Sequence, residues 1–157
     1  LQYLQIKFSS RSRISVERVA SGQGISNIYE FLAWKFPGRI NQAVHDRWVG
    51  PIDQVHAFDP SVITQAARDG ECDLCKQAVE TFVGAIGAEA GVVALKHMPF
   101  GGIYLTGTVN VKNKDFILGH MGQPGHFLEA FQDKGRVADM LKRVPVFMMR
   151  DANIGER

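Results

Sequence analysis

The segment from Asp73 to about His97 constrains the fold most, because it is long, apolar and rich in glycine. Its apolar residues recur at the helical spacing, which predicts one long helix. They are Val79, Phe82, Val83, Ile86, Ala90 and Val93. Gly84, Gly87 and Gly91 lie on or near one face of that helix, and each interior glycine costs about 0.5–1 kcal/mol relative to alanine. We interpret these glycines as places where a neighbouring backbone approaches closely.

The composition limits the classes of partner. The 157 residues, 45% of them apolar, suffice for one domain with a core. A formal net charge of +2 gives no electrostatic reason to expect nucleic acid as a partner. Glu80 and Glu89 interrupt the apolar run, which argues against a membrane span. The chain opens on "LQYLQIKF" and stops at "DANIGER", and we expect both ends to be cuts through a larger protein.

Helices and strands are expected to alternate along the chain, which favours an α/β architecture. Residues 1–8 resemble the end of a helix, and residues 39–58 carry no strong period and are expected to form an irregular connection. Further helices are expected at residues 25–36, at 60–69 after Asp59-Pro60, and at 129–143 with a break near Gly135. Residues 103–106 and the stretch "VPVFMM" are expected to be core strands.

The only two cysteines, Cys72 and Cys75, form the motif "CDLC". One such pair supplies two thiolates, whereas a structural zinc site needs four ligands. None of the five histidines falls at a partnering spacing. We therefore expect reduced, structural thiols, no metal site, and a reducing compartment such as the cytosol.

Two short stretches offer groups that could bind a ligand. Ser21-Gly22-Gln23-Gly24 feeds a helix, whose N-terminal N–H groups favour anions. This stretch is not the dinucleotide fingerprint, since Asn27 holds the third glycine position, and it could equally be an ordinary turn. Upstream, Glu17 alternates with Val16 and Val19 in what we expect to be an extended run with one buried face. Its carboxylate is either a solvated strand residue or a fixed acceptor for hydroxyl donors.

The run "YLTGTV" places Gly107 and Thr108 directly after an expected strand. Such a strand end could present backbone N–H groups and a hydroxyl to a ligand, because open α/β sheets bind ligands at the carboxyl edge. From the residues alone, ordinary turn chemistry and a nucleotide-binding edge both remain open.

Five stretches together resemble the C-terminal part of bacterial-type glucokinase, in the same order and at similar spacing. They are "ERVASGQGISNIYEFL", "ECDLCKQAVETFVGAIGAEAGVVAL", "PFGGIYLTGTV", "FQDKGR" and "VPVFMMRDANIG". The resemblance runs from about Ser15 to the end of the chain, and "ERVASG" and "FQDKGR" are its most specific parts.

The resemblance implies a fold and a reaction. Residues 1–157 would form the C-terminal portion of an actin-like, ribonuclease H-like sugar kinase with two lobes, mostly its large lobe, with a mixed sheet flanked by helices. The reaction would convert ATP and D-glucose to ADP and glucose 6-phosphate, with Mg²⁺. In the family, the catalytic Asp, an "EGGH"-like sugar-binding segment and both glycine-rich phosphate loops lie upstream. The stretch would thus contain no catalytic residue, and we expect it to be inactive alone.

The resemblance also implies roles for individual residues. Glu17 falls where the family places a glutamate that binds sugar hydroxyls. Gly107 and Thr108 fall on the turn of the adenosine motif, although many family members have Gly-Gly there. Ser21 and Gly22 would lie near the cleft. We expect Glu17 and the 107–108 turn to face opposite ends of one ligand-holding gap.

Two further expectations accompany the resemblance. The protein would be a cytoplasmic homodimer that binds glucose and ATP, with the long helix or the helix after Asp59-Pro60 as candidate dimer faces. The alternative is a relative that kept the fold and serves as a sugar-responsive binding or regulatory module. The presence or absence of the upstream Asp and phosphate loops would decide between them.

Overall fold

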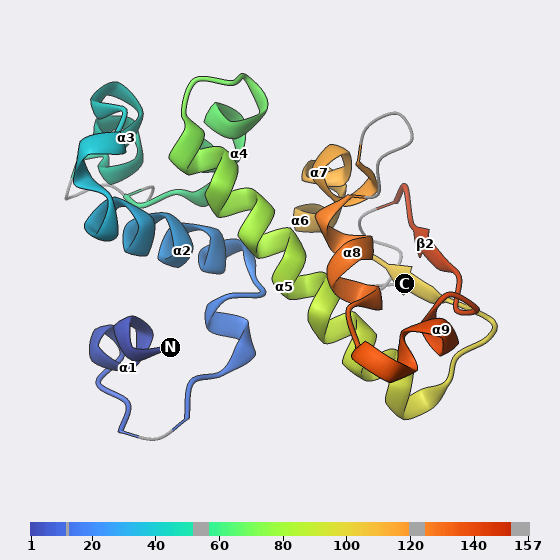
Figure 1. Cartoon of the computed structure of the whole chain (residues 1–157). Coiled ribbons are helices and arrows are strands. Elements are labelled where there is room, and N and C mark those ends of the chain that lie inside the picture. The colour runs from blue at the N-terminus through green and yellow to red at the C-terminus, as the bar shows by residue number, and fades with distance from the viewer. Residues whose placement is uncertain (12, 52–56, 120–124, 152–157) are drawn as a thin grey trace. The chain divides into compact units, whose positions relative to one another are not determined.

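A computed structural model describes residues 1–11, 13–51, 57–119 and 125–151 (Figure 1). The chain forms two compact units, residues 1–82 and 83–157, and the long helix runs from the first into the second. Each unit has its own set of buried apolar side chains. The motif "VPVFMMRDANIG" is described only as far as Asp151.

The first unit consists of helices arranged around α2 (Figure 1). Tyr3 of α1 contacts Phe31 and Trp34 on one side of α2, whereas Tyr29 of α2 contacts Trp48 of α3 on another side. The elements are α1 (Gln2–Lys7), the 3₁₀ turn η1 (Val16–Arg18), α2 (Gly22–Lys35), η2 (Pro37–Arg39), α3 (Gln42–Val49), α4 (Pro60–Arg68) and the first part of α5 (Asp73–His97).

The predicted helices of this unit are confirmed, with one addition. The carboxylate of Asp59 accepts the N–H of Ser61 at 2.8 Å and so caps α4, and Gly70 follows with a φ of 72°. The prediction of an irregular connection over residues 39–58 is wrong for residues 42–49, which form α3. Residues 52–56 lie outside the described part of the chain.

Helix α3 depends on contacts far away in the sequence. Only Val44 and Trp48 of this helix are buried, too few for a recognisable period. Trp48 packs edge-on against Tyr29 and Phe58, and its indole N–H donates to Ser26 Oγ at 3.1 Å. These tertiary contacts stabilise a helix whose own sequence gives only a weak signal.

The second unit contains a parallel pair of strands and several short helices (Figure 1). Ile103, Tyr104 and Leu105 pair with Val146, Phe147 and Met148 in register. This arrangement confirms the existence of the predicted strands and the α/β character of the chain. The strands are not core strands as expected, because Tyr104 is 58% and Phe147 is 44% exposed. The elements after α5 are β1 (Ile103–Leu105), α6 (Thr108–Lys112), α7 (Lys114–Leu118), α8 (His126–Gln132), η3 (Gly135–Val137), α9 (Ala138–Leu141) and β2 (Val146–Met148).

The glycines of α5 explain how α8 comes so close to it. A Cβ on Gly87 would lie 2.2 Å from the carbonyl oxygen of Phe127, and one on Gly91 would lie 2.4 Å from that of Phe131. The predicted close approach of a neighbouring backbone is therefore confirmed at these two positions. Gly84 differs, because a Cβ there would meet no atom within 4 Å.

Candidate functional site

Glu17 lies in a single 3₁₀ turn, η1, and not in the extended run that its alternation with Val16 and Val19 predicts. The Ser15 side chain accepts the N–H of Glu17 at 3.3 Å, and the N–H groups of Val19 and Ala20 both donate to the carbonyl of Val16. Val16 is 51% exposed, so the expected buried face does not exist. The hydrogen bond from the Glu17 N–H to the Ser15 side chain stabilises a tight turn where the alternation of residues predicts a strand.

Two contacts with α2 fix this turn in place. Asn27, which is buried, donates from Nδ2 to the carbonyl of Arg18 at 2.9 Å. A Cβ on Gly24 would lie 2.0 Å from the carbonyl oxygen of Val19. Any residue other than glycine at this position would therefore clash with the backbone of Val19. From the sequence alone, Gly24 is one residue of a glycine-containing stretch and Asn27 is a misfit to a glycine fingerprint, so neither is predicted to hold the turn. The signal that could have found them is a glycine three residues after a capping serine, followed by an amide on the buried helix face.

The Glu17 carboxylate is exposed to solvent. Among the described residues no basic side chain pairs with it, and the neighbouring Arg18 instead places its guanidinium 4.2 Å from the centre of the Phe8 ring. A carboxylate in this state can accept hydrogen bonds from hydroxyl donors. The turn thus presents an acceptor that no basic side chain of the described residues occupies, on a backbone held by α2.

Ser21 and Gly22 form the start of α2. Ser21 Oγ accepts the N–H of Gly24 at 3.0 Å, so this hydroxyl serves as the N-cap of the helix. Gly22 is the first helical residue. The structure therefore places Glu17, Ser21 and Gly22 on two consecutive elements that contact each other.

Gly107 and Thr108 lie where β1 gives way to α6. Gly107 has a φ of 92°, a conformation that glycine tolerates far better than other residues. No atom lies within 4 Å of a Cβ placed there. Glycine is therefore favoured at this position by the backbone conformation and not by a lack of space. Thr108 is exposed. Because β1 and β2 are parallel, this turn lies at the carboxyl edge of the strand pair.

The two groups of candidate residues belong to different units. Glu17, Ser21 and Gly22 lie in the first, and Gly107 and Thr108 lie in the second. Their convergence on a single gap stays a prediction.

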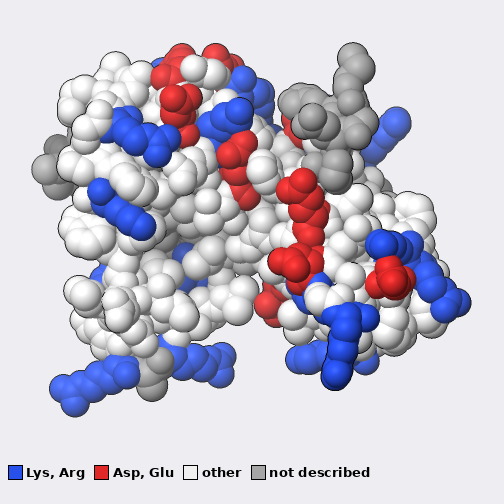
Figure 2. All heavy atoms as spheres, viewed as in Figure 1, with Lys and Arg blue, Asp and Glu red and all other residues white. Residues whose placement is uncertain are grey.

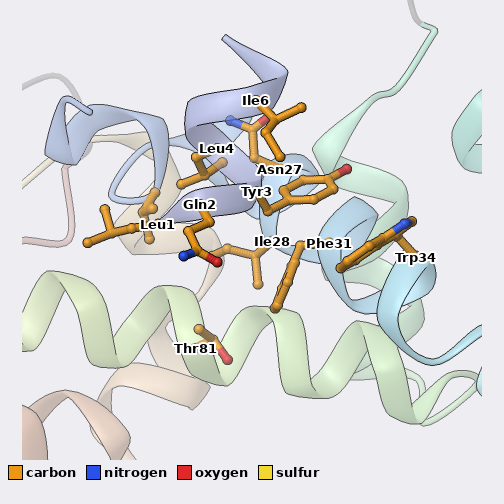
Figure 3. Close-up of a pocket in the computed structure, with 11 residues that line it drawn as sticks. Leu1, Gln2, Tyr3, Leu4, Ile6, Asn27, Ile28, Phe31, Trp34 and Thr81 are labelled. Atoms are coloured by element: carbon orange, nitrogen blue, oxygen red, sulfur yellow. The ribbon is translucent and has the colours of Figure 1, made fainter. Parts of the chain in front are cut away.

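A cavity of about 720 Å³ in the first unit does not coincide with these candidates (Figure 3). Figure 3 shows Tyr3 and Trp34 next to each other at this cavity, with Phe31 beside them. None of the five candidate residues lines it. Its largely apolar lining offers few partners for the hydroxyl groups of a sugar. We do not assign the sugar site to this cavity.

The "CDLC" thiols are buried at the start of α5. The N–H of Cys75 donates to Cys72 Sγ at 3.4 Å, which gives Cys72 a capping role. Burial raises the pKa of the Cys75 thiol, and its hydrogen bond with Cys72 raises that pKa further. Cys75 is therefore a neutral thiol at physiological pH, and the thiolate is the reactive form.

We expect neither cysteine to react with the thiol reagent DTNB while the protein is folded. Both should react once denaturant is added, in line with the two cysteines of the sequence. Absorbance of the released thiolate at increasing urea concentration measures this. Rapid modification in native buffer would show that the pair is accessible and would contradict a purely structural role.

Charged side chains do not gather into one basic patch on the face seen in Figure 2, where Lys and Arg are scattered among Asp and Glu. Across residues 1–11, 13–51, 57–119 and 125–151, no three His, Cys, Asp or Glu side chains lie close enough to hold a metal ion.

Comparisons with known proteins agree on one family. The family profile named Glucokinase matches residues 1–155. A glucokinase of Synechocystis sp. is 39% identical over 99% of this chain, which covers 43% of that protein. A glucokinase of Nostoc sp. is 38% identical over 99% of the chain and 45% of that protein. The chain thus spans less than half the length of these curated relatives.

A solved structure gives the same result. The crystal structure of a glucokinase from an Antarctic psychrotroph superposes with a TM-score of 0.69 at 26% sequence identity. The match covers 97% of this chain and 41% of that protein. The α/β arrangement described above is part of the fold of a sugar kinase. From its sequence and its fold, the chain belongs to the glucokinase family.

Proposed function

We propose that the intact protein transfers a phosphoryl group from ATP to D-glucose and forms ADP and glucose 6-phosphate. The observation that carries this proposal is the exposed carboxylate of Glu17, which pairs with no basic side chain of the described residues and lies on a turn held by α2. The membership of the family and the position of Glu17 in "ERVASG" support the same reaction. In this proposal residues 1–157 supply sugar-side and nucleotide-side contacts, and the catalytic base comes from outside them.

Glu17 would bind hydroxyl groups of the sugar. Its carboxylate oxygens accept hydrogen bonds and cannot donate them, which suits a ring of hydroxyl donors. A hydrogen bond to a charged group contributes about 1.5–3 kcal/mol. Because the Arg18 guanidinium lies over Phe8, it does not compete with the sugar for this acceptor.

Gly107 and Thr108 would face the adenosine of ATP. The space next to the Cα of Gly107 is open. Because glycine has no side chain, a ligand could approach the backbone closely at this turn. Thr108 adds an exposed hydroxyl. Ser21 and Gly22 are also proposed as cofactor-binding residues, although the Ser21 oxygen already caps α2. Mg²⁺ would neutralise phosphate charge, and it usually binds phosphate oxygens together with one or two carboxylates.

The remaining features of the proposal concern location and assembly. We propose a cytoplasmic homodimer without nucleic-acid or membrane partners, with α4 or α5 as the dimer face. By length and composition alone α5 could cross a membrane, but a core helix passes the same test. Its buried residues Leu74, Cys75, Ala78, Val79, Phe82 and Val83 favour the role of a core helix.

The test of this function is the substitution Glu17→Gln in the intact protein. Glutamine keeps the size of the side chain and removes the charge, so the hydrogen bonds to glucose weaken. A loss of 1.5–3 kcal/mol would lower kcat/KM for glucose about ten- to a hundredfold. Coupled assays with glucose and MgATP measure this value.

Glu89→Gln is the matched control, because Glu89 is also exposed and lies on the part of α5 that belongs to the second unit, whereas Glu17 lies in the first. It should leave the kinetics unchanged. Wild-type kinetics for Glu17→Gln would remove Glu17 from the sugar site. A wild-type protein that phosphorylates no hexose, but binds glucose, would instead favour a regulatory module.

A further inference from the structure

The amide of Asn27 is placed to control the position of Glu17. Asn27 is 2% exposed and lies on the face of α2 toward η1. Its Nδ2 donates to the carbonyl of Arg18 at 2.9 Å. That carbonyl belongs to the residue directly after Glu17, so the bond holds the backbone that carries the carboxylate.

Helix packing alone does not require an amide at this position. A buried polar group that lacks a hydrogen bond costs about 1–3 kcal/mol, so an amide in a core must find a partner. Leu or Ile, such as the neighbour Ile28, fills a helix face without that cost. At position 27 the partner lies in the η1 turn and not in α2, so the amide joins the two elements.

The other contacts of the turn do not replace this bond. Gly24 admits the Val19 carbonyl, but this contact is a steric close approach and not a side-chain hydrogen bond. The Arg18 side chain holds the far side of the turn through Phe8, which itself lies just beyond the end of α1. The Asn27 bond is thus the directional contact between the turn and α2.

We infer that Asn27 is the positioning residue for Glu17, which it holds through the Arg18 carbonyl in the orientation that receives sugar hydroxyls. This inference rests on the proposed function of Glu17. Displacement of a binding group by about 1 Å can cost up to a hundredfold in rate. Loss of the Asn27 bond should therefore weaken glucose binding although Asn27 does not touch the sugar.

The experiment replaces Asn27 by aspartate in the intact protein. Aspartate has the same shape, but when it is ionised its carboxylate cannot donate and repels the Arg18 carbonyl. We expect the KM for glucose to rise about tenfold, in line with the loss of about one hydrogen bond, while the KM for ATP stays within twofold. If Asn27→Asp does not fold, Asn27→Ser takes its place, because serine is smaller and its hydroxyl cannot reach the carbonyl.

Ser26→Ala is the matched control. Ser26 is the preceding residue of α2, is equally buried, and donates to the carbonyl of Phe58 at 2.9 Å, away from η1. This variant should lose stability in urea and keep the wild-type KM for glucose. An equal rise of that KM in Ser26→Ala and Asn27→Asp would overturn the inference, because the effect would then reflect stability alone.

The double variant with Glu17→Gln separates the inference from the proposed function. If Asn27 acts through Glu17, adding Asn27→Asp to Glu17→Gln should change the KM for glucose less than twofold. The inference would be overturned if the increase in the KM for glucose of the double variant equalled the product of the increases in the two single variants. It would also be overturned if Glu17→Gln raised this KM and Asn27→Asp left it at the wild-type value. A normal Glu17→Gln would overturn the proposed sugar-binding role of Glu17, and the inference with it, whereas the activity of the wild-type protein with glucose and MgATP tests the proposed reaction.

Discussion

Replacing Phe82 by alanine is expected to lower the free energy of unfolding by about 3–5 kcal/mol. Phe82 is fully buried and lies on the α5 stripe with Val79 and Val83, which are also fully buried. Removing its ring takes away apolar burial and leaves a cavity that a tightly packed helix cannot close. Urea unfolding followed by far-ultraviolet circular dichroism measures the change.

Phe100→Ala is the control for this substitution. Phe100 is 51% exposed and makes a cation–π contact with Arg143 at 5.1 Å. We expect its replacement to cost about 1 kcal/mol or less. If Phe82→Ala and Phe100→Ala lowered the free energy of unfolding equally, the burial of Phe82 in α5 would not be the cause of its effect.

Replacing Gly87 by alanine is expected to destabilise the protein by about 3 kcal/mol, although alanine is the better helix former. The new Cβ would lie 2.2 Å from the carbonyl oxygen of Phe127 and 2.9 Å from its Cα. Both are backbone atoms of α8, so relief requires α8 to move away from α5. Thermal and urea unfolding measure this loss.

Gly84→Ala on the same helix should have the opposite sign. No atom lies within 4 Å of a Cβ at Gly84, and its backbone is helical. We expect a gain of about 0.5–1 kcal/mol from the reduced entropy of the unfolded chain. A stable Gly87→Ala protein would mean that α5 and α8 are not in backbone contact at this point.

The sequence predicted helix α5 with both its ends, and the cap of α4, because these signals are local. The spacing of apolar residues and the pairing of Asp59 with Pro60 act within a few residues along the chain. The same reasoning failed at the end of the apolar stripe, where Val93 is 42% exposed. Periodicity shows which residues share a face, but not how far a neighbouring element covers that face.

The candidate site illustrates the same division. The motif "ERVASG" drew attention to Glu17, yet its alternation with Val16 and Val19 predicted a strand where the structure has a turn. The Ser15 cap, the Gly24 contact and the Asn27 bond decide the turn. The last two join α2 to Val19, which directly follows η1, and to Arg18 of η1. No period of two or 3.6 residues encodes such contacts.

By itself the sequence determined the long helix α5, the helices α2 and α4, both strands, and which family the motifs resemble. The tertiary structure decided that Gly87 and Gly91 meet α8 while Gly84 does not, that residues 42–49 are helical, and that Asn27 supports the turn of Glu17. The physical reason is the range of the interactions. Propensity and capping act between near neighbours in the chain, whereas close packing and buried hydrogen bonds depend on residues that only folding brings together.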